Sequence, residues 1–452
     1  MSKLGPYCAV LALGGCAPSV TLPVAPEVTS AEWQQQAPPP AGEARSLASG
    51  LAHPELEALI ARAIERNADL GAARARVARA RAQLGVARAA MLPVVTTSAG
   101  ISRTRTDNSG GPLFNFSEGF AGLDISYDLD LFGEQRAGRR ADRARLAAAA
   151  FNRDAAALVV ETEVARAFVQ HSALGDRIAL LDRNIQAARE LERIIRLRFD
   201  AGDATRVDLG LQSIQVRQLE AEKLRLDEAL TRTRNALAVL AGEEAPLFRL
   251  PRGTLQSLSI PSVAPVQPGE LLVRRPDVRA AEARIAAAEG DVEAARRAFL
   301  PRLRINAGAL GQAATLGGPI GATLSVGADL LAPIFNRGRL RANLRVASAA
   351  QMETVELYRG ALLTALAEVE DALAAVNSAG AREALLADIV AEAAITARLV
   401  RRQYLEGESD LQWVLDAEEL LVQAEDARAV ALQERLEAAI DLYKALGGLP
   451  RA

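Results

Sequence analysis

The chain has 452 residues, of which 50% are hydrophobic and 24% are charged, the ratio of a globular protein with a sizeable core. The formal net charge is −3, so there is no basic excess of the kind that nucleic-acid-binding domains carry. Aromatic residues make up only 4% of the chain, and Ala, Arg, Glu and Leu dominate long stretches, which favours long helices. No apolar run approaches about eighteen residues, so no transmembrane helix is predicted.

The side chains that enzymes use are scarce. The chain has two histidines, His53 and His171, in no metal-ligand spacing with cysteine. Its internal lysines, Lys223 and Lys444, follow Glu and Tyr, so the Gly-Lys-Ser/Thr phosphate-binding loop is absent. We therefore expect no enzymatic activity, no metal site and no cofactor beyond a covalent lipid.

That lipid is predicted from the N-terminus. An apolar stretch at residues 8–13 leads into Leu13, Gly14, Gly15 and Cys16, which resembles the lipobox of bacterial lipoproteins. Residues 1–15 would then be a lipoprotein signal peptide, and Cys16 would be lipidated. The alternatives are an ordinary signal peptide or a buried helix. Ala17 at the next position favours the outer membrane, and a lone acylated cysteine leaves no intrachain disulfide.

The rest of the chain contains an internal duplication. Segments match 208 residues apart, as residues 67–77 do with 275–285 and residues 87–93 with 295–301. Gly175 and Gly202 match Gly380 and Gly407 at an offset of 205. Such spacing indicates two repeats. The domains are thus predicted as a proline-rich tether at 16–50, repeat 1 at 51–245, a proline-rich linker at 246–276, repeat 2 at 277–448, and a tail at 449–452.

Each repeat is predicted to begin with a helix. The helices span residues 56–91 and 279–299, and Pro93 and Pro301 stop them because proline lacks an N–H group and clashes with the preceding turn. Arg275 and Asp277 flank the proline that starts the second helix, so we expect both to be structural.

Two strands follow in each repeat. Residues 121–129 and 323–330 alternate apolar with polar residues, and 95–106 and 303–310 are less regular strands. Loops are expected at 107–119 and 311–321. The acidic strand residues are expected to face an aqueous lumen or a subunit interface, or else to be strand ends in solvent. These residues are Asp124, Asp128, Asp130 and Asp329.

Each repeat is predicted to end with a very long helix followed by a second helix. Residues 133–200 would span about 100 Å as one helix, longer than any compact soluble domain needs. We expect Gly175 and Gly380 to interrupt these helices, and Gly202 and Gly407 to reverse the chain.

Half-apolar strands of about ten residues fit a transmembrane barrel. One chain supplies four strands, which cannot close, and open edges in lipid leave backbone groups unpaired. Three copies would give twelve strands, wide enough for an aqueous lumen. The predicted fold class is therefore mainly α with a small membrane β part.

This layout resembles the TolC-like outer membrane factors, in the lipoprotein branch that serves resistance-nodulation-division (RND) pumps. The resemblance covers about residue 50 to the C-terminus and is carried by residues 271–282 (LLVRRPDVRAAE), 333–339 (PIFNRGR), 368–373 (EVEDAL), 414–417 (VLDA) and 442–448 (LYKALGG). It implies a homotrimer whose twelve-stranded barrel in the outer membrane of a Gram-negative bacterium continues as a periplasmic helical barrel. It also implies two partners, a periplasmic adaptor (membrane fusion protein) and an inner-membrane RND pump.

The resemblance also assigns the tip of the helices. Asp416 falls on a carboxylate of the periplasmic gate, and Trp413 falls where some members carry a second acid. Tyr404 and Asp208 match residues that tether the closed tip, although Ser409 stands at the position of a family arginine. The adaptor would dock on the tip turns, Gly202 with Asp203 and Gly407 with Glu408, which are more acidic than is usual in the family.

Two other functions remain open at this point. One is a periplasmic coiled-coil lipoprotein without a pore, which the duplicated strand pairs disfavour. The other is the exit duct of a type I secretion system. The sequence does not identify the exported compound.

Overall fold

The structure is a computed structural model that describes residues 32–35, 47–106, 114–251, 253–261, 267–270, 274–313 and 318–448. The predicted signal peptide and Cys16 lie outside these residues. The chain divides into two compact units. The described part of the first unit comprises residues 76–150 and 280–359, and that of the second belongs to 27–75, 151–279 and 360–452.

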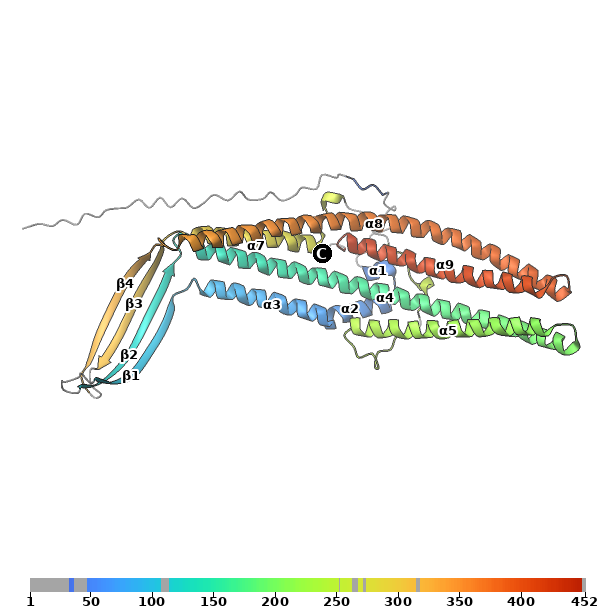
Figure 1. Cartoon of the computed structure of the whole chain (residues 1–452), viewed down its shortest axis with the longest axis horizontal. Coiled ribbons are helices and arrows are strands. Elements are labelled where there is room, and N and C mark those ends of the chain that lie inside the picture. Colours follow the sequence, from blue (N-terminus) through green and yellow to red (C-terminus); the bar gives the residue numbers. More distant parts are fainter. Residues whose placement is uncertain are drawn as a thin grey trace, which may run out of the picture. The chain divides into compact units, whose positions relative to one another are not determined.

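The first unit contains one four-stranded antiparallel sheet, formed by β1 (Val94–Thr106), β2 (Phe114–Leu129), β3 (Arg302–Ala313) and β4 (Ile320–Leu331) (Figure 1). Its strand order is β1-β2-β3-β4, so β1 and β4 each have one side that no described strand of the chain pairs. All four predicted strands are confirmed. The predicted loops were too long, because backbone pairing continues through glycine-rich ends such as Gly119 opposite Ala313.

The sheet has one apolar and one polar face. Opposed residues of an antiparallel ladder lie on the same face, and successive residues alternate between faces. Leu123, Ala309 and Leu324 are aligned across three strands. One row further on, Asp124, Gly308 and Ser325 are aligned on the opposite face. The apolar face also holds Val95, Ala99, Ile101, Ile125, Leu129, Leu303, Ile305, Val326, Ala328 and Leu330.

The long helices are α4 (Glu134–Ala201) and α8 (Arg337–Glu406), of 68 and 70 residues. At 1.5 Å per residue each is about 100 Å long, as predicted. The predicted interruptions at Gly175 and Gly380 were wrong, because both helices continue through them. A helical glycine costs only about 1 kcal/mol relative to alanine. Burial of Leu174 and Ile178 beside Gly175 outweighs that cost.

The first predicted helix is two helices, α2 (Pro54–Arg66) and α3 (Ala68–Ala89). Asn67 separates them: its Oδ1 accepts hydrogen bonds from the N–H groups of Asp69 and Leu70, at 3.0 and 3.1 Å. Its Nδ2 donates to the Leu240 carbonyl at 3.0 Å. Asparagine is a favoured N-cap because its side chain satisfies the free N–H groups of the first turn.

The corresponding helix of repeat 2, α7 (Pro276–Arg297), begins at its proline as predicted. Each long helix forms a helical hairpin with the helix that follows it. These second helices are α5 (Arg206–Leu240) after α4 and α9 (Leu411–Ala445) after α8, both of 35 residues. The short elements are α1 (Leu47–Leu51), η1 (Leu255–Ser257) and η2 (Pro268–Glu270). Matched helix lengths and positions in the two halves support the duplication.

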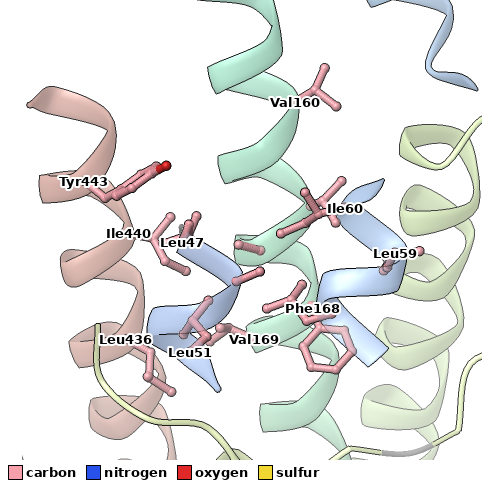
Figure 2. Packing of buried hydrophobic residues seen from close by; sticks show 14 of the residues in the cluster. Leu47, Leu51, Leu59, Ile60, Val160, Phe168, Val169, Leu436, Ile440 and Tyr443 are labelled. Carbon is pink, nitrogen blue, oxygen red and sulfur yellow. The ribbon is translucent and has the colours of Figure 1, made fainter. Parts of the chain in front are cut away.

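The core of the second unit forms around α1. Leu47 and Leu51 of this short helix lie between α4 and α9, where Phe168 and Ile440 are buried (Figure 2). Fully burying such a side chain contributes about 1.5–3 kcal/mol. This cluster holds α1, α2, α4 and α9 together.

Arg275 joins the start of α7 to two other elements, which confirms its structural role. Its guanidinium donates to Asp277 at 2.7 Å and to the Ala445 carbonyl at 2.9 Å, and it pairs with Glu368 at 2.6 Å. The side chain is only 8% exposed. Burial opposes ionisation of Asp277, but the hydrogen bond and charge of Arg275 hold the pKa of that carboxyl below its ordinary value.

Candidate functional site

The two hairpin turns of the second unit have the same backbone structure. Gly202 and Gly407 have φ of +86° and +80°, in the left-handed region that favours glycine. The Gly202 N–H donates to the Phe199 carbonyl at 3.0 Å and the Asp203 N–H to the Arg198 carbonyl at 2.8 Å. Gly407 and Glu408 make the equivalent bonds, at 3.1 and 2.8 Å. Both turns are thus Schellman motifs, which end a helix and expose Asp203 and Glu408 as neighbours of the glycine.

The helices that leave these turns begin differently. Thr205 and Asp208 form a capping box at the start of α5: Asp208 Oδ2 accepts from the Thr205 N–H at 2.8 Å, and Thr205 Oγ1 accepts from the Asp208 N–H at 3.1 Å. The carboxylate of Asp208 is therefore engaged within its own chain. Asp410, the corresponding residue before α9, makes no side-chain cap. The Thr-x-x-Asp spacing in the sequence would have predicted the capping box.

Tyr404 packs between the two hairpins. It is 7% exposed and belongs to a cluster with residues of α4, α5 and α9, namely Leu191, Ile195, Leu209, Leu411 and Val414. The Arg198 guanidinium lies over its ring, 4.8 Å from the centroid, a cation–π contact. No hydrogen bond joins the Tyr404 side chain to Asp208 in the part of the chain that the structure describes.

Asp416 and Trp413 lie on the surface of α9. Asp416 is exposed and accepts a hydrogen bond from Gln412 Nε2 at 2.7 Å, one helical turn earlier. Trp413 is 63% exposed, which is unusual for so large an aromatic side chain. Both side chains are therefore free to face another molecule or an aqueous passage.

Glu418, two residues beyond Asp416, was missed by sequence reasoning. It lines a cavity of about 290 Å³ among α4, α5, α8 and α9. Burial raises the pKa of Glu418, and the Arg401 guanidinium at 3.7 Å opposes that shift only in part. Its spacing from the apolar residues Val414 and Leu421 could have predicted this inward position.

The acidic strand residues divide into two groups. Asp124, Asp128 and Asp329 lie on the polar face of the sheet, where Asp128 accepts two hydrogen bonds from Arg304, at 2.6 and 3.1 Å. Asp130 differs from the prediction, because it accepts from the N–H groups of Gln135 and Arg136 and thereby caps the start of α4.

The described residues contain neither a candidate metal site nor a candidate membrane-spanning helix. No cluster of His, Cys, Asp and Glu side chains there could hold a metal ion. Every described helix is also too short or too polar to cross a membrane.

Comparisons with known proteins agree on one family. A family model described as outer membrane efflux protein matches residues 59–243 and 268–448. The pyoverdine export outer membrane protein OpmQ of Pseudomonas aeruginosa is 32% identical over 99% of this chain and 97% of its own. A crystal structure of a membrane protein from Pseudomonas aeruginosa is 29% identical and has a TM-score of 0.87, covering 95% of this chain and 99% of the other. The outer-membrane channel OprN is 26% identical with a TM-score of 0.84, covering 96% and 99%.

Proposed function

The chain belongs to the outer membrane efflux protein family and is an outer-membrane channel component of an efflux pump, and we propose that three copies form the passive exit duct of a tripartite pump. Small molecules would reach this duct from an inner-membrane RND transporter through a periplasmic adaptor. A duct of this kind binds no cofactor and catalyses no reaction.

The observation that carries the proposal is the amphipathic sheet with two unpaired edges. Unpaired backbone groups in lipid cost several kcal/mol each, so β1 and β4 must find partners. Because β1 and β4 are antiparallel, β4 of one chain can pair with β1 of the next and continue the ladder. Three chains give a twelve-stranded barrel, with the face of Leu123 and Val326 toward lipid and that of Asp124 and Asp128 toward the lumen.

The tip of the second unit would be the periplasmic gate and docking end. Exposed Asp416 is available to form a ring of three carboxylates at the entrance, with Trp413 beside it. Tyr404 and Asp208 would hold the closed tip through the packing cluster and the capping box described above. The adaptor would dock on the turns at Gly202–Asp203 and Gly407–Glu408, whose acidic residues call for a basic surface on that partner.

The lipid on Cys16 would anchor the chain to the outer membrane, with the long helices in the periplasm of a Gram-negative bacterium. The barrel would hold the protein in the membrane independently of this anchor.

Planar-bilayer recording of the purified full-length chain tests the function. We expect stable, ion-conducting channels. A chain that inserts into bilayers but never conducts would contradict the duct and favour a lipoprotein without a pore.

A further inference from the structure

The start of α8 carries a cluster of arginines that no carboxylate of the described residues neutralises. Arg337, Arg339, Arg341 and Arg345, here called the α8 arginine cluster, are all exposed. Residues 330–352 contain no Asp or Glu. None of the four arginines makes an ion pair with any described residue, whereas Arg145 of α4 pairs with Asp142 and Asp291.

The position of these arginines opposes the helix dipole. The N-terminus of a helix carries a partial positive charge, which acidic side chains stabilise and basic ones oppose. The first turn of α8 contains no acidic residue. Residues that run against a local preference are expected where a surface serves a function.

Three large apolar side chains before the cluster are exposed. Leu331, Ile334 and Phe335 are 73%, 69% and 100% exposed, and they lie where the amphipathic sheet ends. Apolar side chains followed directly by long basic ones match the boundary between hydrocarbon and head groups, where arginine extends its charged end toward the phosphates.

Assembly would increase the positive charge at this level; this step rests on the proposed trimer. Pairing of β4 with the next chain's β1 brings α8 beside the helix that precedes β1, which is α3. The last part of α3 exposes Arg81 and Arg88, and residues 70–93 contain no Asp or Glu. The neighbouring chain therefore supplies further arginines and not the missing carboxylates.

We infer that the α8 arginine cluster binds the phosphate head groups of anionic phospholipids in the membrane leaflet that faces the helices. A guanidinium is weakly hydrated and matches a phosphate with two parallel hydrogen bonds. In an anionic head group no ammonium offsets the phosphate charge, so the arginines prefer it to a zwitterionic head group. Basic clusters beside a membrane-spanning element recruit anionic lipid by the same attraction.

The test compares lipids at the surface of the reconstituted full-length protein. Spin-labelled phosphatidylglycerol and phosphatidylcholine are introduced into phosphatidylcholine vesicles, and electron paramagnetic resonance gives their relative association with the protein. We expect a preference for phosphatidylglycerol of about fivefold or more, weakened by salt. The variant Arg337→Gln/Arg339→Gln/Arg341→Gln should lose most of it.

A matched control replaces three exposed arginines of the second unit, Arg183, Arg217 and Arg402, with glutamine. The control should keep the wild-type preference. The inference would be overturned if the α8 variant kept the wild-type preference for phosphatidylglycerol. It would also be overturned if the α8 variant and the control variant lost this preference equally. The oligomer mass and conductance of the same samples separate this failure from that of the proposed function. A conducting trimer without lipid preference contradicts the lipid site alone, and a chain that neither trimerises nor inserts contradicts both.

Discussion

Replacing Arg275 with methionine tests the contact that joins α7, α8 and the end of α9. The substitution keeps most of the side-chain volume but removes the charge-assisted bonds to Asp277, Glu368 and the Ala445 carbonyl. Breaking a fully buried ion pair costs about 3–5 kcal/mol. Here the carboxylates of Asp277 and Glu368 are 47% and 50% exposed, so water compensates them in part. We therefore expect a loss of about 2–3 kcal/mol.

The loss is measured by thermal unfolding of the detergent-solubilised protein, followed by circular dichroism. It corresponds to a fall of roughly 4–10 °C in unfolding temperature for a unit of this size. The matched control is Arg382→Met, which removes an exposed pair with Glu434 and should cost less than about 0.5 kcal/mol. If Arg275→Met costs no more than this control, the assignment of Arg275 as a structural link is refuted.

The same variant has a pH signature. Because the folded-state pKa of Asp277 is lowered, its stabilising contribution is present above the unfolded value of about 3.9 and is lost as pH falls through the folded pKa. Arg275→Met removes the cause of that shift. The stability difference between wild type and variant should therefore shrink as the sample is acidified below about pH 4.

Three further predictions concern the tip and the anchor. Asp416→Asn should lower cation selectivity and relieve block by multivalent cations in planar bilayers, and Asp410→Asn should act less; wild-type behaviour in both would mean that the ring lies elsewhere. Cys16→Ser should abolish acyl labelling while the protein still inserts, so labelling at the wild-type level would contradict the lipid anchor. Burial raises the folded-state pKa of Glu418. The contribution of this carboxyl to the stability of the fold is therefore present below its unfolded pKa of about 4.3 and is lost as pH rises through the folded pKa. Glu418→Gln should thus raise the unfolding temperature more at pH 8 than at pH 4, and an equal change at both would contradict the shift.

The features predicted correctly from the sequence are those with a local physical cause. The α7 helix starts at Pro276 because proline suits the first turn. The turns occur at Gly202 and Gly407 because only glycine adopts their positive φ without strain. The alternation of residues 121–129 fixed both faces of β2, since side chains alternate along any strand.

The errors arose where a distant contact decides the local structure. Asn67 is held in its capping position by a hydrogen bond from its side-chain amide to the Leu240 carbonyl. No sequence pattern near residue 67 indicates that this carbonyl lies close. Gly175 stays helical because its neighbours are buried by other helices. At the tip, the sequence placed Asp416 on an exposed surface, but the inward position of Glu418 was overlooked although its spacing from Val414 and Leu421 indicates it.

Closure of the sheet between chains is the central claim, and the mass of the purified complex tests it most directly. Light scattering with correction for bound detergent, or native mass spectrometry, gives the number of chains in the solubilised particle. We predict three chains, because β1 and β4 each leave one edge unpaired and three four-stranded sheets make a barrel with an open lumen. A stable particle of one or two chains would contradict the account.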